Sequence, residues 1–185
     1  MVEVTERISE ADPAGSWLKR TLDVVGAFAL LLFFAPAAIL LVCAIRLSRA
    51  GPILTREQTI GLNGKPFGRW RLHRAAGREG VVDQIARRAG LADLPSALNV
   101  IAGEMSLIGP EPHSPKRSVL VGKGREDYAR RFEARPGMIW PCGADGHPSM
   151  GADLDYVSRW TAFVDLKVAA RYAVNRLFRE EQDAD

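Results

Sequence analysis

The feature that most constrains this chain is an uncharged apolar run of 22 residues, from Val24 to Ile45. A helix of this length is sufficient to cross the hydrocarbon core of a bilayer. The rest of the chain is much more polar, so the hydrophobic content of 47% and the mean hydropathy of −0.06 conceal an uneven distribution. With 185 residues, the chain is long enough for one domain with a substantial core. We therefore expect a single domain attached to a membrane.

Basic residues stand on both sides of the apolar run. Lys19 and Arg20 precede it, and seven basic residues against one acidic residue fall between positions 46 and 76. Pro36 lies near its centre, where it removes a backbone donor and clashes with the preceding turn. This pattern predicts a re-entrant helix over residues 16–47 that bends and returns to the cytoplasmic face. A straight transmembrane helix is the alternative, whereas the run is longer than the apolar part of a signal peptide.

The cysteines, histidines and net charge exclude several classes of protein. The two cysteines, Cys43 and Cys142, are too few for a disulfide framework or a thiolate zinc site. The three histidines are scattered along the sequence and form no metal-binding motif. A net charge of +3 and an isoelectric point near 9.1 are mildly basic. This balance is too weak for a dedicated nucleic-acid-binding protein, so we expect no nucleic acid partner.

The chain divides into an acid-rich tail over residues 1–15, the membrane helix over 16–47 and a domain over 48–185. Within the domain, two extended segments flank the turn Gly61–Gly64 and predict a β-hairpin. Further short helices are expected, at residues 81–89, 95–101 and 126–133, and irregular segments at 110–115 and 141–151. The predicted fold class is α/β, with a small, helix-rich mixed domain and amphipathic surface helices.

The clearest amphipathic pattern lies near the C-terminus, over residues 153–178. Val157, Trp160, Val164 and Val168 fall on one stripe of a predicted helix, and basic residues flank the stripe. Such a helix is suited to lie on a membrane surface. Periodicity favours equally a helix that covers the core of the domain, so both interpretations stay open.

The stretch Leu91–Pro112, read as LADLPSALNVIAGEMSLIGPEP, is the most informative about function. It resembles without a gap the pattern of the bacterial sugar transferases, or monotopic phosphoglycosyl transferases: approximately LDELPQ, then NV and GDMSLVGPRP. The resemblance extends over roughly residues 17–178. It includes further short motifs in the same order: Lys19-Arg20-Thr-Leu-Asp23, Gly61-x-x-Gly64-x-x-Phe67, Arg135-Pro136-Gly137 and the segment Asp155–Lys167.

This resemblance implies a reaction, a cofactor and a location. The family transfers a sugar-1-phosphate from a nucleotide diphosphate-sugar to polyprenyl phosphate, in the assembly of exopolysaccharides and related glycans. An aspartate attacks the donor's phosphorus and forms a phospho-sugar intermediate, and the adjacent glutamate helps to hold Mg²⁺. A carboxylate nucleophile divides a difficult displacement into two steps, and a hard cation neutralises the phosphoryl charge. The expected location is the cytoplasmic face of a bacterial inner membrane, in contact with membrane lipid.

The sequence departs from the family at its reactive positions. Ala92-Asp93 stands where the family has Asp-Glu, so the nucleophile is replaced by a methyl group, and Glu111 replaces an arginine. We expect Asp93 to keep the glutamate's part in catalysis and in binding the metal, with a shorter reach. Glu104, where the family has aspartate, is a second candidate carboxylate. Candidate phosphate-binding residues are the arginines of the domain at three positions: Arg87, Arg88 and Arg135.

The predicted function is therefore that of a sugar-transferase family protein with weak or absent transferase activity. Its predicted ligands are nucleotide-sugar and polyprenyl phosphate, and the predicted cofactor is weakly bound Mg²⁺. The alternative is a non-catalytic membrane partner that regulates an active transferase of the same family. Ala92 separates the active from the inactive hypothesis most directly.

Overall fold

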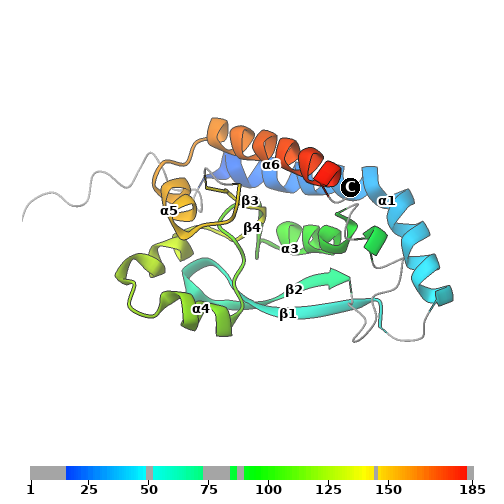
Figure 1. Cartoon of the computed structure of the whole chain (residues 1–185), viewed down its shortest axis with the longest axis horizontal. Helices are drawn as coiled ribbons and strands as arrows, with labels where there is room; N and C mark the ends of the chain where they lie inside the picture. The colour runs from blue at the N-terminus through cyan, green and yellow to red at the C-terminus, as the bar shows by residue number, and fades with distance from the viewer. Residues whose placement is uncertain (1–15, 49–51, 73–83, 87–89, 144–145, 183–185) are drawn as a thin grey trace, which may run out of the picture.

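The computed structural model describes residues 16–48, 52–72, 84–86, 90–143 and 146–182. These residues form the predicted helix-rich mixed domain, with two small sheets (Figure 1). A long N-terminal helix lies beside the C-terminal helix, and the hairpin lies on the opposite side of the domain (Figure 1). In chain order, the longer elements are α1 (Trp17–Ser48), β1 (Leu54–Ile60), β2 (Pro66–Leu72), α3 (Ala97–Ala102), α4 (Pro115–Gly122), α5 (Met150–Ser158) and α6 (Ala162–Gln182).

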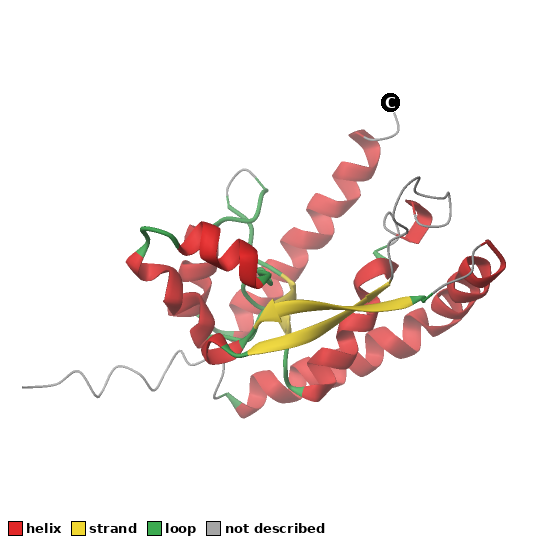
Figure 2. Ribbon diagram, turned by 90° about the horizontal axis from the view of Figure 1, so that it is seen from below, coloured by secondary structure: helices red, strands yellow, loops and turns green. Residues whose placement is uncertain are grey.

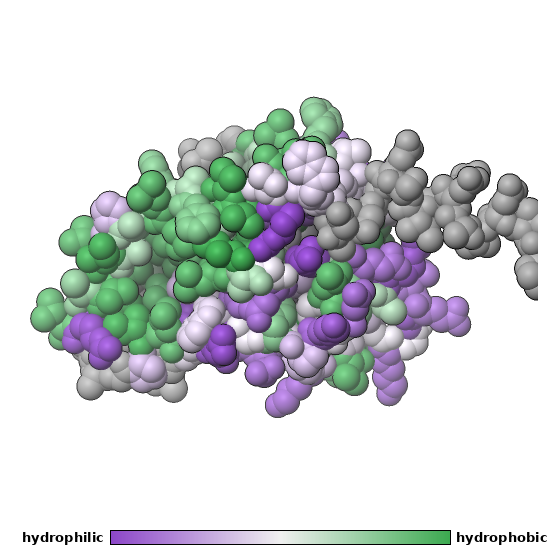
Figure 3. Space-filling view, turned by 180° about the vertical axis from the view of Figure 1, so that it is seen from behind, coloured by the Kyte–Doolittle hydropathy of each residue, from purple (hydrophilic) through white to green (hydrophobic). Residues whose placement is uncertain are grey.

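Helix α1 contains the apolar run and Pro36. Among the described residues, it is the one helix long and apolar enough to cross a membrane, and only 11% of its most apolar window is buried. The helix changes direction between its N-terminal and C-terminal parts (Figure 1). The predicted bent helix is therefore observed, while its re-entrant course stays a prediction. Seen from behind, apolar side chains gather over one part of the molecule and hydrophilic ones over another (Figure 3).

The inner side of α1 belongs to the hydrophobic core of the domain. Near its N-terminal half, Ala27 is fully buried against Ala97, Val100 and Met105. Farther along, α1 contributes Leu41 and Ile45 to a second cluster. The other members precede α3 in the chain: Ala86, Leu91 and Leu94. The same helix therefore supplies both an exposed apolar surface and part of the domain's packing.

Strands β1 and β2 form the predicted antiparallel hairpin, with Ile60 paired to Pro66 and Leu54 to Leu72. The turn between them is a short 3₁₀ segment, η1 (Leu62–Gly64). Asn63 and Gly64 have φ of 54° and 74°, in the left-handed region that asparagine and glycine adopt most readily. Figure 2 shows the twisted ribbon that results.

A second sheet, not expected from the sequence, joins β3 (Ser106–Ile108) to β4 (Gly137–Ile139) in parallel. The two backbones approach so closely that no side chain fits between them. A Cβ at Gly109 would lie 2.3 Å from the carbonyl oxygen of Arg135, and one at Gly137 would lie 2.3 Å from the nitrogen of Gly109. Glycine is thus a steric requirement at both positions.

The prediction of one continuous C-terminal helix is wrong. The segment forms two helices, α5 and α6, because the Thr161 hydroxyl accepts a hydrogen bond from Val164 N and starts a new helix. The predicted apolar stripe packs against Tyr156 and Ala134, so it covers the core. A different face of α6 exposes Phe163, Leu166 and Val174, with Phe163 73% exposed.

The remaining elements agree with the sequence in part. The helix expected at 95–101 is observed as η2 (Leu91–Ser96), a 3₁₀ segment, continued by α3. The helix expected at 126–133 forms as a 3₁₀ helix, η3 (Glu126–Glu133). The irregular segment at 110–115 ends at Ser114, which caps α4, a helix not expected from the sequence. The tail and most of the helix expected at 81–89 lie outside the described residues.

Candidate functional site

A cleft of about 650 Å³ opens between the hairpin, η2 and the start of α4. We call it the arginine cleft. It has an apolar edge at Trp140 and Pro112, whereas its polar lining carries four basic and three acidic side chains. These are Arg69, Arg71, Lys116, Arg117, Glu57, Asp93 and Glu111. An excess of basic groups in a concave site is suited to a ligand that carries phosphate.

Asp93 is the predicted site residue that lines this cleft. Its Oδ1 accepts hydrogen bonds from two guanidinium groups, at 3.0 Å from Arg69 Nη2 and 2.7 Å from Arg71 Nε. The two arginines are two residues apart on β2, so they point to the same face of the strand. Arg71 also contacts Glu57 Oε2 at 3.2 Å across the hairpin. The Asp93 carboxylate is therefore the η2 partner of two arginines that β2 supplies.

Position 92 contributes no reactive group. Ala92 precedes Asp93 within η2, and η2 is anchored on both sides by the buried side chains of Leu91 and Leu94. The Ser96 hydroxyl accepts from Arg69 Nε and donates to the carbonyl oxygen of Trp70, which holds η2 on β2. The wall of the cleft that η2 forms is thus firmly held, with a methyl group at the position where the family resemblance predicts a nucleophile.

Burial and charge set the ionisation of the cleft arginines. Burial lowers the pKa of Arg69, and Asp93 only partly opposes this effect. Burial would also lower the pKa of Arg71, but Asp93 and Glu57 outweigh burial and raise it. An arginine stays charged at neutral pH in either case. Both groups therefore remain available as cations for an anionic ligand.

Glu111, where the family has arginine, is held by the cations around it. It contacts Arg117 Nη2 at 3.0 Å and His113 Nε2 at 3.2 Å. Burial raises the pKa of Glu111, but the contacts with His113 and Arg117 lower it more, so the net shift is downward. The carboxylate of Glu111 thus offsets the positive charge of Arg117, whereas an arginine at this position would add a positive charge to the cleft.

Behind Glu111 lies a buried network centred on Arg131. Its guanidinium contacts His113 Nδ1 and the carbonyl oxygen of Glu111, and lies 2.5 Å from Asp153 Oδ2. Burial raises the pKa of Asp153 to about 7, against the opposing effect of Arg131. Burial also lowers the pKa of His113. This network fixes the Pro110–Pro115 segment that forms one wall of the cleft.

The other predicted site residues lie elsewhere. Glu104 accepts a hydrogen bond from Asn99 Nδ2 at 2.6 Å and is not part of the cleft lining. Arg135 donates from Nε to the carbonyl oxygen of Gly103 at 2.9 Å, just after α3. Arg87 and Arg88 lie outside the described residues. The structure therefore places Asp93 in the cleft and Glu104 and Arg135 outside its lining.

The donor set of the cleft does not fit a resident Mg²⁺ ion. Among the described residues, no group of three histidine, cysteine, aspartate or glutamate side chains is arranged to hold a metal. The Oδ1 atom of Asp93 is already engaged by Arg69 and Arg71. Two neighbouring guanidinium groups repel a cation, and Mg²⁺ prefers carboxylates supplemented by phosphates and water.

Lys19 and Arg20, predicted to flank the membrane, hold α1 on the domain. Lys19 is buried, with Nζ 2.8 Å from Asp165 of α6 and 3.7 Å from Asp23. Arg20 donates to the carbonyl oxygens of Val100 and Ile101 at the end of α3. Their contacts join α1 to α6 and α3.

The functional residues that sequence reasoning missed are the basic side chains of the cleft. Arg69 and Arg71 are two residues apart in a segment that the sequence predicts as a strand. The alternation of side chains in a strand therefore predicts that both point to the same face. Lys116 and Arg117 follow Ser114-Pro115, a pattern typical of a helix start, which brings them to one end of α4. No local signal indicated that α4 lies across the cleft from β2.

Comparison with known proteins adds to this geometry. The pattern of the bacterial sugar transferase family matches residues 14–179. A UDP-glucose:undecaprenyl-phosphate glucose-1-phosphate transferase of Caulobacter vibrioides is 34% identical over 179 residues, which cover 83% of this chain and 67% of the relative. The protein of the same name from Escherichia coli is 29% identical, over 82% of this chain and 38% of the relative. The chain therefore spans well under half of the Escherichia coli protein.

A relative of similar length is the exopolysaccharide production protein ExoY of Rhizobium meliloti. It is 27% identical over 201 residues, which cover 89% of this chain and 88% of the relative. The similarity to this shorter relative extends over most of both chains.

Proposed function

Because the chain belongs to the bacterial sugar transferase family, we propose that it binds a nucleotide diphosphate-sugar and polyprenyl phosphate at the cytoplasmic face of a bacterial membrane. The names of its relatives specify UDP-glucose and undecaprenyl phosphate, which supports these two classes of ligand. The basic lining of the arginine cleft supports the binding of phosphate, and the exposed apolar surface of α1 supports contact with lipid. Exopolysaccharide assembly is the process that the relatives suggest.

We propose further that the chain forms no phospho-sugar intermediate, so its transferase activity is weak or absent. The observation that carries this proposal is the pair Ala92-Asp93. The methyl group of Ala92 has no lone pair with which to attack phosphorus. Losing the nucleophile removes the covalent route, whereas other changes in the cleft alter only binding.

Asp93 is poorly placed to replace the missing nucleophile. Successive residues of a 3₁₀ turn point in directions about 120° apart, so its carboxylate does not occupy the place of a side chain at position 92. Its Oδ1 also accepts hydrogen bonds from Arg69 and Arg71. These contacts favour an ion-paired carboxylate that fixes the cleft.

A second candidate function is regulation of an active family member. The observation that favours it is a cleft that retains four basic side chains without the nucleophile. Such a protein binds the donor or the lipid carrier without consuming it. In this case, co-expression of the chain with an active transferase changes glycan yield, and the change depends on Arg71.

Mg²⁺ enters the proposal only together with a ligand. Asp93 and Glu104, which does not line the cleft, form no metal site by themselves, and donor phosphates would supply the oxygen atoms that the cleft lacks. The cation would neutralise phosphate charge in the bound complex.

The test is intact-protein mass spectrometry after incubation with UDP-glucose and Mg²⁺. We expect no sugar-phosphate adduct on the unmodified chain. The matched variant Ala92→Asp with Asp93→Glu restores the family's pair and is expected to form an adduct, at least in part. Ala92→Asn with Asp93→Glu is the control, because an amide has a similar size but does not attack phosphorus. An adduct on the unmodified chain, on Asp93 above all, would overturn the proposed inactivity.

A further inference from the structure

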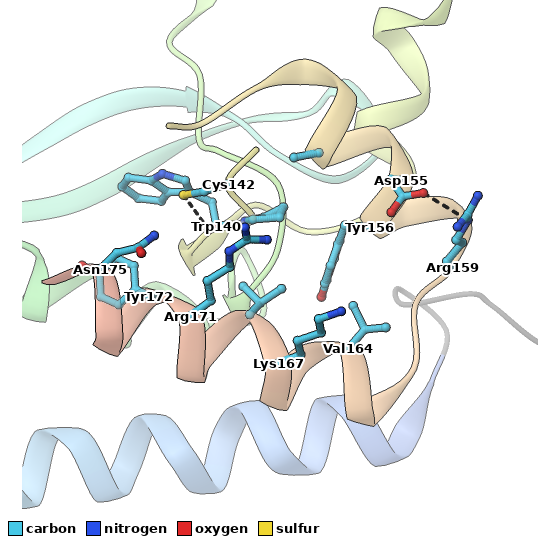
Figure 4. Close-up of a pocket in the computed structure, with 13 residues that line it drawn as sticks. Trp140, Cys142, Asp155, Tyr156, Arg159, Val164, Lys167, Arg171, Tyr172 and Asn175 are labelled. Carbon is cyan, nitrogen blue, oxygen red and sulfur yellow. Dashed lines mark hydrogen bonds and ion pairs between the residues drawn. The ribbon is translucent and has the colours of Figure 1, made fainter. Parts of the chain in front are cut away.

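A second cavity, of about 320 Å³, lies between α5, α6 and the segment that follows β4 (Figure 4). We call it the α6 pocket. Its lining combines aromatic rings with basic groups and one amide. The polar and aromatic residues are Trp140, Tyr156, Tyr172, Asp155, Arg159, Lys167, Arg171 and Asn175. This volume is near the lower end for small-molecule sites.

Two cations of α6 give the pocket its charge. Lys167 and Arg171 lie one helical turn apart; Arg171 extends toward the segment that carries Trp140 and Cys142, and Lys167 lies toward Tyr156 and Val164 (Figure 4). Within the described part of the chain, neither makes an ion pair with a carboxylate. Arg159, by contrast, is paired with Asp155 at 3.0 Å on the rim. The two cations of α6 are therefore available to an anionic ligand.

Aromatic side chains supply the walls. The Tyr156 hydroxyl donates to the carbonyl oxygen of Ile108 and contacts Asp165 Oδ1 at 2.7 Å, so this ring is fixed in place. Trp140 and Tyr172 add two further rings to the lining. Arginine or lysine beside aromatic rings is typical of sites that bind a phosphate joined to a planar base.

Trp140 connects this pocket to the arginine cleft, because it lines both cavities. A ligand with a ring in one cavity and a diphosphate would therefore extend past Trp140 toward the basic groups of the other. We propose that the α6 pocket binds the nucleoside monophosphate end of the nucleotide sugar, with Lys167 and Arg171 on the phosphate and Trp140 against the base. The inference rests on the proposed binding of a nucleotide sugar.

The experiment is calorimetric titration of the full chain in detergent with UMP, uridine and inorganic phosphate. We expect UMP to bind more tightly than either fragment. Lys167→Met and Arg171→Met each remove one charge-assisted contact and are expected to weaken UMP binding about tenfold. Trp140→Leu is expected to weaken UMP binding about five- to tenfold and phosphate binding little. The control is Lys123→Met, because Lys123 is an exposed cation that lines neither cavity.

Several outcomes would overturn the inference. Inorganic phosphate that binds as tightly as UMP would exclude recognition of the base. If Lys167→Met and Arg171→Met left UMP binding unchanged but weakened binding to phosphatidylglycerol vesicles, the pocket would be a lipid-headgroup site. Unchanged thermal unfolding of each variant shows that a loss of binding is not a loss of fold, and Arg171→Lys, which retains the charge, is expected to recover most of the affinity.

Failure of this inference is distinguishable from failure of the proposed function. An adduct on the unmodified chain contradicts the proposed inactivity but leaves the α6 pocket as it stands. UDP-glucose binding that depends on Arg71 but not on Lys167 or Arg171 contradicts the α6 pocket and leaves the arginine cleft. Binding that depends on all three residues supports both.

Discussion

Asp93 shows how a single residue can keep its place in a site while its chemistry changes. It stands in the cleft at the position for which the family resemblance predicts a metal-binding carboxylate, yet it is shared between Arg69 and Arg71. Both ion pairs come from one strand, so the carboxylate acts as a tie between β2 and η2. The side chain is about one-third exposed, so each pair contributes modestly to stability.

This arrangement predicts weak binding of Mg²⁺ by the protein alone. The cation would have to bind beside the two guanidinium groups that hold Asp93 Oδ1, and no group of carboxylates completes a metal site among the described residues. Calorimetry with Mg²⁺ and no nucleotide is expected to give no saturable heat, for the unmodified chain and for Asp93→Asn alike. Tight binding that survives Asp93→Asn would show that the metal site lies elsewhere.

His113 predicts a pH dependence. Burial lowers the pKa of His113 below 6.5, and the charge of Arg131 lowers it further. The charge of Glu111 and its hydrogen bond with His113 raise this pKa, but only in part. The unfolded chain therefore takes up the proton first as the pH falls, so His113 contributes stability above pH 6.5 that is lost below it. Thermal unfolding of His113→Asn is expected to depend less steeply on acidification in this window.

Asp153 acts in the opposite sense, which is why the comparison must be between variants. The pKa of Asp153 is raised to about 7, so the folded state holds this proton more tightly than the unfolded chain does. The contribution of Asp153 to stability is therefore lost as the pH rises from about 4 to 7. Tyr128, Arg117, Arg131 and Glu111 remain in both proteins. Parallel pH profiles for His113→Asn and the unmodified chain would contradict the assignment to His113.

At the scale of the element, α1 carries the clearest prediction. Pro36 lacks the N–H that would close a helical turn, and the helix bends along its length. If the helix is re-entrant, cysteines introduced at positions 15 and 50 react only from the cytoplasmic side of intact cells. Cys43 and Cys142 are first replaced by serine, so that each introduced thiol is the sole target. Labelling from outside at either position would contradict the re-entrant course.

Replacement of the proline is the complementary test. Pro36→Leu restores the missing backbone hydrogen bond and is expected to straighten α1, which moves one end toward the far face of the membrane. Accessibility at position 50 would then change while that at position 15 stays the same. Ala35→Leu is the control, since it adds the same apolar bulk beside the proline without restoring a donor. Identical labelling in both variants would mean that Pro36 does not determine the course of the helix.

Elements set by local chemistry could be predicted, whereas those set by distant contacts could not. The hairpin follows from Gly61, Asn63 and Gly64 between two extended segments, and the apolar run defines α1. The pair β3–β4 could not be predicted, because each strand has only three residues and its partner lies about thirty residues away along the chain. The arginine cleft could not be predicted either, because its walls come from β2, η2 and α4, which are far apart in the sequence. The carboxylate of Asp93 was found through family resemblance, but its arginine partners were not.

At the scale of the whole molecule, Lys19 joins the first and last helices that the structure describes. Its ammonium group lies between Asp23 of α1 and Asp165 of α6, and its side chain is only 4% exposed. Tyr156 contacts the same Asp165. This cluster keeps α6 beside α1 and thereby holds the base of the α6 pocket in place.

Lys19→Met is therefore expected to be strongly destabilising, by about 3–5 kcal/mol, because two carboxylates then lose their buried cation. Arg159→Met is the matched control: its pair with Asp155 is exposed, so we expect a change below about 1 kcal/mol. Chemical unfolding in detergent measures both. Similar values for the two variants would show that the Lys19 cluster contributes little to the fold.

Helix α1 has a consequence for how the molecule is made. It is completed by the ribosome before any other described element, and its inner side supplies Ala27, Leu41 and Ile45 to the two clusters on which the domain packs. If α1 enters a membrane as it is made, the strands and later helices emerge when the helix that supplies one wall of their core is already anchored. Synthesis without a membrane would then leave the exposed apolar surface of α1 to associate with other chains, so we expect productive folding of this protein to depend on a bilayer at which the domain is assembled.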